Sequence, residues 1–588
     1  MMGFADIHVH MFAHLGFGGG VMGGASYDPK GGVNAALRPD YATDVPMENV
    51  FPVVALAAGA WPAKSTFAVC PTYLGNCGKF LLHGDHMFLD SPMFGGLGDG
   101  ANGHMGAPAF SAWPRWTSVM HQQVYYRWLE RAWRGGMRLM TMLAVNNEVV
   151  CKASRRRVGE KCDDSMTAID KQLDAAFDFQ TFLDRESGGH GRGWFRIVTS
   201  YAAAREVIRA GKLAVVLGIE VDNLFNCKEH GSCTPARVQA KVDEYYKRGV
   251  RHIFPIHNFD NGFGGAATWQ DAINVGNAIS EGRYWEVEDC HKEGYGFWLD
   301  SAFERLAIEG LGIESRPKEP PLNYTSGKIQ KYASCNRHGL SALGKTLIES
   351  LMDHGMIIDI DHMSRRSLAD TLQLVKKRRY PIVAGHVQFF DRHRQTFGDN
   401  VGRHERMRTA DHLDAIRASG GLVAVMTKDD QQDGGAAKGE KPLSFGAISN
   451  NCANSTKTFA QAYLFAISEM KGPVAFGSDF NGFAGHVGPR FGSEACGGSG
   501  AERSAQARAK TRLKYPFVLD GFGTFEEQVS GQKTFDFNVD GLAHVGLYPD
   551  MIADLKRIGV TDKQLEPLFR SAEAYVEMWE RAASRSQP

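Results

Sequence analysis

The sequence lacks any long hydrophobic run and any excess of charge of one sign. Its longest apolar stretch, residues 51–63, contains a proline near either end and is shorter than the roughly 20 residues that a membrane-spanning helix needs. Lysine and arginine together number 66, and so do aspartate and glutamate, which gives a formal net charge of zero. No basic stripe is present to bind nucleic acid or an anionic membrane. We therefore expect neither a membrane span nor a nucleic-acid partner.

The sequence also lacks a C-x-x-C pair, which argues against a zinc site built from cysteines. The ten cysteines lie in stretches rich in glycine, asparagine or charge, which are typical of loops. An even number of loop cysteines, several of them close together, predicts disulfides and an oxidising compartment, whereas a cytosolic enzyme with reduced cysteines is the alternative. The close pairs are Cys70 and Cys77, Cys151 and Cys162, and Cys227 and Cys233, and the others are Cys290, Cys335, Cys452 and Cys496.

A signal peptide is not expected at the N-terminus, because a histidine motif already occupies residues 8–10. Together with the cysteines, this predicts a secreted or periplasmic protein whose leader is absent from the sequence.

The second half of the chain alternates patterns typical of helices and strands. Helices are expected at residues 340–354, 409–419 and 459–470, and another after Ser364, which can cap it. Strands are expected at residues 356–360, 381–384, 422–426 and 474–476. This βαβα rhythm predicts an α/β fold, a (β/α)8 barrel of the TIM type.

Three stretches interrupt the rhythm, at about residues 60–120, 270–335 and 484–535. The first is rich in Gly, Pro, Met and aromatic residues with little periodicity, and the other two are similar. We interpret residues 1–588 as one barrel with long loop insertions over its mouth. A small separate cap domain is the alternative.

Residues that can bind metals follow the apolar runs at six positions. Side chains at the carboxyl ends of parallel barrel strands converge on one mouth, so these six could form one dinuclear site. A cluster of histidines and carboxylates suits zinc or a similar divalent ion that activates water. The six are His8 and His10 in A-D-I-H-V-H, Glu220 in V-V-L-G-I-E, His362 in I-I-D-I-D-H, His386 in P-I-V-A-G-H and Asp479 in V-A-F-G-S-D.

Each position also has a structural interpretation. His8 and His10 point to the same face of a strand, but two histidines at this spacing also arise by chance. His362 and His386 could be buried histidines bonded to neighbours, and Asp479 could cap a turn. Glu220 follows a very apolar run, where a charge must be paired or bound to metal, and Glu148 is its rival.

Five motifs, taken in order, resemble the membrane dipeptidase (renal dipeptidase) family, peptidase family M19 of the amidohydrolase superfamily. The resemblance is strongest from residue 212 onward, and the N-terminal third contributes only residues 6–10. Two features depart from the family: His8-x-His10 stands where the family has His-x-Asp, and the chain is much longer. The motifs are G-V-R-H-I-F-P-I-H-N, H-G-M-I-I-D-I-D-H-M-S, P-I-V-A-G-H, F-G-S-D-F-N-G and the tail G-L-A-H-V-G-L-Y-P-D-M.

The resemblance implies specific roles. Glu220 would bridge two divalent ions, expected to be zinc, although manganese and cobalt accept the same ligands. Asp479 would be the general base that passes a proton to the leaving amine. His257 would bind substrate by stabilising the tetrahedral oxyanion. An arginine would bind the substrate carboxylate, with Arg403, Arg406 and Arg408 as candidates, of which we favour the last two.

The same resemblance leaves a few details to be tested. Asp359 and Asp361 are candidates to orient the ring of His362, and Asp361 stands where the family usually has serine. The family is often dimeric, so a homodimer is possible.

We therefore expect a binuclear metallohydrolase that cleaves the amide bond of a dipeptide or an N-acyl amino acid. A lactone or ester hydrolase using the same site is the first alternative, since fold does not fix function. The alternative from another class is a binding protein on a decayed barrel, which predicts missing ligands.

Overall fold

The computed structural model describes most of the chain outside the first expected insertion. The described residues are 2–37, 114–118, 121–153, 159–297, 299, 333–397, 403–428, 444–445, 448–493, 495–498 and 510–586.

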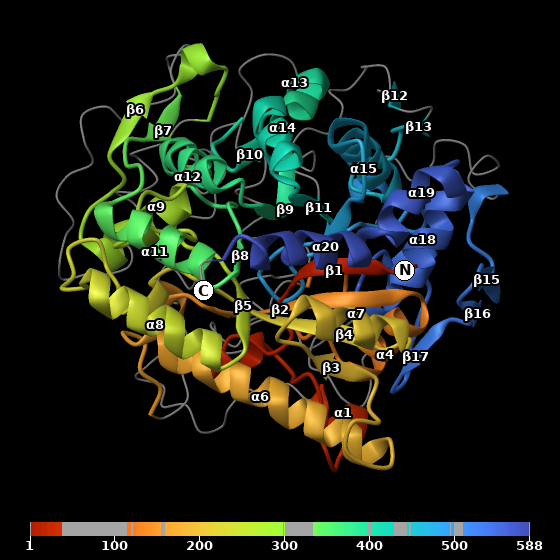
Figure 1. Cartoon of the computed structure of the whole chain (residues 1–588). Helices are drawn as coiled ribbons and strands as arrows, with labels where there is room; N and C mark the ends of the chain where they lie inside the picture. The colour runs from red at the N-terminus through yellow and green to blue at the C-terminus, as the bar shows by residue number, and fades with distance from the viewer. Residues whose placement is uncertain are drawn as a thin grey trace, which may run out of the picture.

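Eight parallel strands form the centre of the molecule (Figure 1). Each strand pairs with the next one in the list below, and β14 pairs with β1. A parallel bridge between Asp359 and Val383 joins β8 to β9, and the Ile360 N–H donates to the Val383 carbonyl at 2.9 Å. The sheet therefore closes, which confirms the predicted barrel. The strands are β1 (Phe4–Val9), β2 (Met137–Asn146), β4 (Leu213–Val221), β5 (Val250–Ile253), β8 (Ile357–Ile358), β9 (Val383–Phe389), β11 (Leu422–Met426) and β14 (Ala475–Gly477).

Helices cover the outside of the barrel, and several have side-chain caps, including the expected cap at Ser364 (Figure 1). The side chains of Ser341, Ser364 and Thr409 each accept a backbone N–H from the first turn of their helix. The left-handed Gly420, with φ 76°, ends α14. The surrounding helices are α4 (Tyr126–Arg134), α6 (Ser165–Glu186), α7 (Tyr201–Arg209), α8 (Pro235–Lys247), α11 (Ala342–Asp353), α12 (Arg365–Arg378), α14 (Ala410–Ser419), α15 (Thr456–Met470) and α18 (Tyr548–Arg557).

Two further helices, α19 (Asp562–Phe569) and α20 (Ser571–Ala583), lie against the amino-terminal end of the barrel. The Ser571 hydroxyl accepts the backbone N–H of Ala5 at 2.8 Å, at the start of β1. The Tyr575 hydroxyl reaches His252 Nδ1, 3.0 Å away, inside the barrel. This end is therefore packed, and a site can open only at the carboxyl end.

The barrel strands are buried on both faces, as expected for a parallel sheet covered by helices. Every residue of β1 and β4 is buried. The rings of Phe4 and Phe476 meet edge to face with centroids 5.5 Å apart, and Phe476 stacks on Tyr548 at 4.6 Å. Burial on both faces explains why these strands appear in the sequence as continuous apolar stretches.

The regions of the expected insertions hold smaller elements where the structure describes them. Strand β6 (Val287–Asp289) pairs antiparallel with β7 (Ser334–Asn336), and residues 517–535 form two short hairpins. Nearly all of the first expected insertion lies outside the described residues. The remaining elements are α1 (Gly32–Ala36), α5 (Glu148–Ala153), α9 (Asp271–Glu281), α13 (Phe390–Phe397), α17 (Phe537–Asp540), β3 (Phe195–Ile197), β10 (Met407–Arg408), β12 (Ser444–Phe445), β13 (Ile448–Ser449), β15 (Phe517–Leu519), β16 (Gly523–Phe525), β17 (Gln528–Ser530) and β18 (Lys533–Phe535).

Disulfides are present, as the cysteine spacing predicts, and Cys70 and Cys77 lie outside the described residues. Among the helices of the described chain, none is both long and apolar enough to cross a membrane. The bonds are Cys151–Cys162, Cys227–Cys233, Cys290–Cys335 and Cys452–Cys496.

Candidate metal centre

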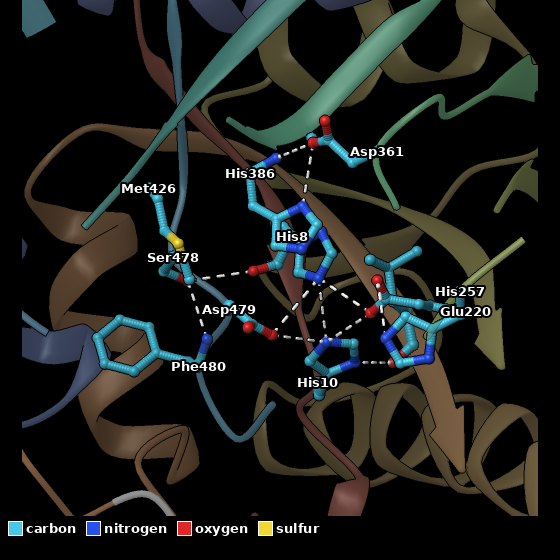
Figure 2. Close-up of polar contacts among 12 residues, drawn as sticks. His8, His10, Glu220, His257, Asp361, His386, Met426, Ser478, Asp479 and Phe480 are labelled. Carbon is cyan, nitrogen blue, oxygen red and sulfur yellow. Dashed lines mark hydrogen bonds and ion pairs between the residues drawn. The ribbon is translucent and has the colours of Figure 1, made fainter. Parts of the chain in front are cut away.

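All six side chains singled out by the sequence converge at the carboxyl end of the barrel. They fall into two groups that share Glu220, and within each group one potential ligand atom per residue lies within 4.8 Å of the others. Strands β1, β4, β8 and β14 each supply a residue from near their end or from the segment that follows, and β9 supplies His386 from within the strand. Figure 2 shows five of the six side chains pointing toward one another. The groups are His8, His10, Glu220 and Asp479, and Glu220, His362 and His386.

The first group lies around one oxygen of Glu220. Glu220 Oε2 is 3.0 Å from His8 Nε2 and 3.1 Å from His10 Nε2 (Figure 2). Asp479 Oδ1 is 3.1 Å from His10 Nε2 and 3.5 Å from His8 Nε2. The two histidines are two residues apart, His8 in β1 and His10 just after its last residue, and their rings meet with centroids 5.0 Å apart.

The second group lies on the side of the other carboxylate oxygen. His362 Nε2 is 3.5 Å from Glu220 Oε1 and 2.8 Å from His386 Nε2. One oxygen of Glu220 thus faces each group. This is the arrangement that a carboxylate bridging two ions requires.

The residues fit a pair of divalent cations. Glu220 Oε1 is buried and accepts no hydrogen bond, which is costly unless a cation is bound there. Burial lowers the pKa of His386 to about 4 and lowers that of His362 strongly, so both imidazoles are neutral, as metal ligands must be. Burial also lowers the pKa of His8, but the charges of Glu220 and Asp479 outweigh it and raise the pKa. These carboxylates therefore attract positive charge to the first group. The mixture of nitrogen and oxygen donors suits zinc.

Asp479 and His10 leave no room for a side chain at position 482. A Cβ added to Gly482 would lie 1.7 Å from Asp479 Oδ1 and 2.8 Å from His10 Cδ2. The glycine in the motif F-N-G therefore permits the close packing of these two residues.

The structure corrects the expectation that Asp359 and Asp361 orient the ring of His362. His362 Nδ1 is buried and has no hydrogen-bond partner. Asp361 Oδ2 instead accepts the backbone N–H of His386 at 2.7 Å and lies 3.0 Å from its ring Nδ1. Asp359 Oδ2 is 3.1 Å from His252 Nε2. The two carboxylates therefore contact histidines on neighbouring strands.

His257 also reaches the centre, and a residue that the sequence analysis did not single out holds it. His257 Nε2 is 3.6 Å from Glu220 Oε1, and its Nδ1 is 2.9 Å from Asp222 Oδ1. Asp222 further accepts the Asn258 backbone N–H at 2.9 Å and the Asn147 amide at 2.6 Å. Asp222 lies two residues after Glu220, so its side chain shares a face of the strand with Glu220, and this spacing could have revealed it.

Glu148, the rival of Glu220, lies outside both groups. It is buried at the start of α5, where it forms ion pairs with Lys152 and with Lys228, the latter at 2.8 Å. The Asn223 amide donates to Oε2, the oxygen that also pairs with Lys228, at 2.9 Å. Its charge is therefore balanced without a metal.

The three candidate arginines point to different surroundings. The Arg406 guanidinium lies 3.0 Å from His386 Nε2 and packs over the ring of Trp269, 4.4 Å from its centroid. Arg408 donates to the backbone carbonyls of Glu405 and Arg406, at 3.2 and 3.1 Å. Arg403 packs over Phe390, 4.7 Å from the ring centroid. Arg406 therefore contacts a residue of the second group.

A closed parallel barrel with six such side chains at its carboxyl mouth is an arrangement that suits a metal-dependent hydrolase. The family model of the membrane dipeptidases (peptidase family M19) matches residues 319–489. This segment contains His362, His386 and Asp479. The match confirms the resemblance drawn from the motifs, and the chain is an enzyme, a dipeptidase-like metallohydrolase.

Other comparisons add less. A search of curated proteins finds no match. Among solved structures, an amidohydrolase from Pseudomonas aeruginosa is 12% identical, with 78% of this chain and 93% of that chain covered and a TM-score of 0.40. A metallo peptidase from Rhodobacter sphaeroides, liganded with a phosphinate mimic of the dipeptide L-Ala-D-Ala, is 11% identical, with 77% and 89% covered and a TM-score of 0.42. The probable dipeptidase PvdM from Pseudomonas aeruginosa is 16% identical, with 79% and 90% covered and a TM-score of 0.40. Likenesses of this size carry no argument for function.

Proposed function

We propose that the chain hydrolyses the amide bond of a dipeptide or an N-acyl amino acid at a centre of two zinc ions. The observation that carries this proposal is the position of Glu220, whose two oxygens face separate groups of potential metal ligands. His8, His10 and Asp479 would hold one ion, His362 and His386 the other, and Glu220 both. When bound, such ions lower the pKa of water and polarise a carbonyl group.

Asp479 is the proposed general base. Burial raises the pKa of its carboxyl, but the hydrogen bonds and charges of His10 and His8 outweigh this and lower it, so the carboxylate is ionised. It can accept a proton from the attacking water and deliver it to the leaving amine. The adjacent Phe480 and Asn481 hold the turn, with the Asn481 amide donating to the His10 carbonyl at 3.1 Å.

His257 and Arg406 are the proposed substrate-binding residues. Burial lowers the pKa of His257, but Glu220 and Asp222 outweigh it and raise the pKa, which favours a ring that donates a hydrogen bond to the developing oxyanion. Arg406 lies on the side of the second group and carries a planar guanidinium suited to a free carboxylate. Arg408 is bound to backbone carbonyls, so we favour Arg406 for this role.

The first test is metal content together with hydrolysis. Elemental analysis of the protein, purified without added metal or chelator, should give about two equivalents of zinc per chain. The metal-loaded protein should release amino acids from dipeptides or N-acyl amino acids, and the same substrates with an amidated C-terminus should react more slowly. Hydrolysis of lactones or esters alone would replace the proposed substrate class. Absence of metal, with none taken up on reconstitution, would overturn the proposal.

Two broader proposals accompany this function. The disulfides support a secreted or periplasmic location. We also propose that the whole chain works as one barrel, with its insertions shaping the substrate pocket, and that it can form a homodimer.

A further inference from the structure

Asp361 connects the two segments that supply the second group of ligands. It follows β8 and precedes His362 in sequence, yet its carboxylate turns to His386, within the next barrel strand, β9. There a single oxygen, Oδ2, lies 2.7 Å from the backbone nitrogen and 3.0 Å from the ring Nδ1 of His386. Figure 2 shows both contacts, and both residues are buried.

This contact determines which ring nitrogen of His386 is free. A carboxylate accepts hydrogen bonds, so the proton of a neutral His386 lies on Nδ1. The lone pair then lies on Nε2, the atom that faces His362 Nε2 at 2.8 Å and the Arg406 guanidinium at 3.0 Å. His386 is therefore held in the tautomer and orientation that a metal ligand needs.

The other histidines of the centre are held less firmly. His10 Nδ1 lies 3.0 Å from the Leu143 carbonyl, a neutral acceptor. The Nδ1 atoms of His8 and His362 are buried without a hydrogen-bond partner. Among these four rings, that of His386 has the recorded contact with a carboxylate outside the ligand groups.

Arg408 in turn holds Asp361. Its Nε lies 3.6 Å from Asp361 Oδ1, and the guanidinium is fixed by the carbonyls of Glu405 and Arg406. Asp361 and Arg408 are both at most 2% exposed, so each charge needs the other in this environment. The backbone that carries Arg406 is thereby connected to the position of His386.

We propose that Asp361 is a positioning residue for the metal held by His362, His386 and Glu220, and that Arg408 keeps its carboxylate in place. The inference rests on the proposed metal centre. It assigns Asp361 a role in metal affinity at one half of the centre, without contact to the substrate.

The test is a zinc titration of the chelator-stripped protein against a chromophoric chelator. In Asp361→Asn the side chain keeps its size but loses its charge. We expect the first equivalent of zinc to bind as in the wild type and the second about 10–100-fold more weakly, the usual loss for such a partner. Glu148→Gln is the matched control, because Glu148 is another buried carboxylate near the mouth but contacts no proposed ligand. It should leave both affinities unchanged.

Arg408→Met is the second variant, in case Asp361→Asn does not fold. It keeps the carboxylate but removes its cation, so the second equivalent should again bind more weakly than the first. Two wild-type affinities in either folded variant would overturn the inference while leaving the proposed function intact. A wild-type protein that binds no zinc would instead overturn the proposed function itself.

Discussion

The substitution Gly482→Ala tests whether the exact position of Asp479 matters for the reaction. The new Cβ would lie 1.7 Å from Asp479 Oδ1, far inside any permitted contact. Carbon and oxygen atoms pack no closer than about 3.2 Å, so the carboxylate oxygen must move by about 1.5 Å. The φ of Gly482 is outside the left-handed region, so alanine adds no backbone strain of that kind.

The magnitude follows from this displacement. A misplacement of about 1 Å in a reacting group can cost about 100-fold in rate. We therefore expect kcat/KM to fall at least about 100-fold, which corresponds to about 2.7 kcal/mol of transition-state stabilisation. The loss should appear mainly in kcat, because Asp479 transfers a proton and Arg406, on the other side of the centre, is untouched.

The assay is steady-state hydrolysis of a substrate that the wild type cleaves, with zinc content and thermal unfolding measured on the same samples. Gly485→Ala, three residues further along the same loop, is the control. Its Cβ would meet the nearest atom, the Trp116 carbonyl oxygen, at 3.6 Å, an ordinary contact. A folded Gly482→Ala enzyme within threefold of wild-type kcat/KM would refute the reasoning, and so would an equal loss in Gly485→Ala.

Three further predictions follow from individual contacts. Arg406→Met should raise KM at least about tenfold for substrates with a free carboxylate and leave amidated substrates unaffected, as steady-state kinetics would reveal. Asp222→Asn should lower kcat up to about 100-fold with little change in KM, because it releases His257; an unchanged kcat would contradict that role. Burial raises the pKa of Glu405 from 4.5 to about 7, so the folded state binds more protons than the unfolded state between these values. Its contribution to stability is present below pH 4.5 and lost as pH rises through 7, by up to about 3 kcal/mol. The free energy of unfolding in urea, measured at pH 5 and 8, should change less with pH in Glu405→Gln than in the wild type. An equal change in both proteins would contradict this prediction.

The sequence predicted where the barrel strands lie because parallel strands are buried on both faces, but not every strand end: β9 runs to Phe389, past the expected end at residue 384, and contains His386. Each of Glu220, His362, His386 and Asp479 follows an apolar run, and in a closed barrel the carboxyl ends of all strands meet at one mouth. The expected helices at residues 340–354 and 409–419 correspond to α11 and α14, each shortened by at most two residues at either end. Local patterns were sufficient for these features, because burial of the strand determines the pattern.

Local reasoning was not sufficient for Asp361 or for the arginines. Asp361 is adjacent to His362, but the two lie in the turn after β8, where His362 has a left-handed φ of 66°, and the partner of Asp361 is 25 residues away on β9. Arg406 and Arg408 are two residues apart, and the directions of their side chains depend on how the segment after β9 packs. Arg408 donates to the backbone carbonyl of Arg406. Sequence spacing carries no information on such contacts between segments. The predicted insertion at residues 60–120 lies almost wholly outside the described residues, so it stays a prediction.

Backbone conformation gives independent support for a working centre rather than a decayed one. His362 and Asp479 both adopt left-handed conformations, with φ of 66° and 60°, which are uncommon for residues other than glycine, although aspartate and histidine adopt them more often than most. Each such residue costs on the order of 1–3 kcal/mol and persists only where the surroundings impose it. One belongs to each group of ligands, and each follows a short strand, β8 or β14. A binding protein on a decayed barrel would need neither this strain nor a buried Glu220 oxygen without a hydrogen bond. Two bound cations would account for both, because they require donors on separate strands to turn toward the same carboxylate.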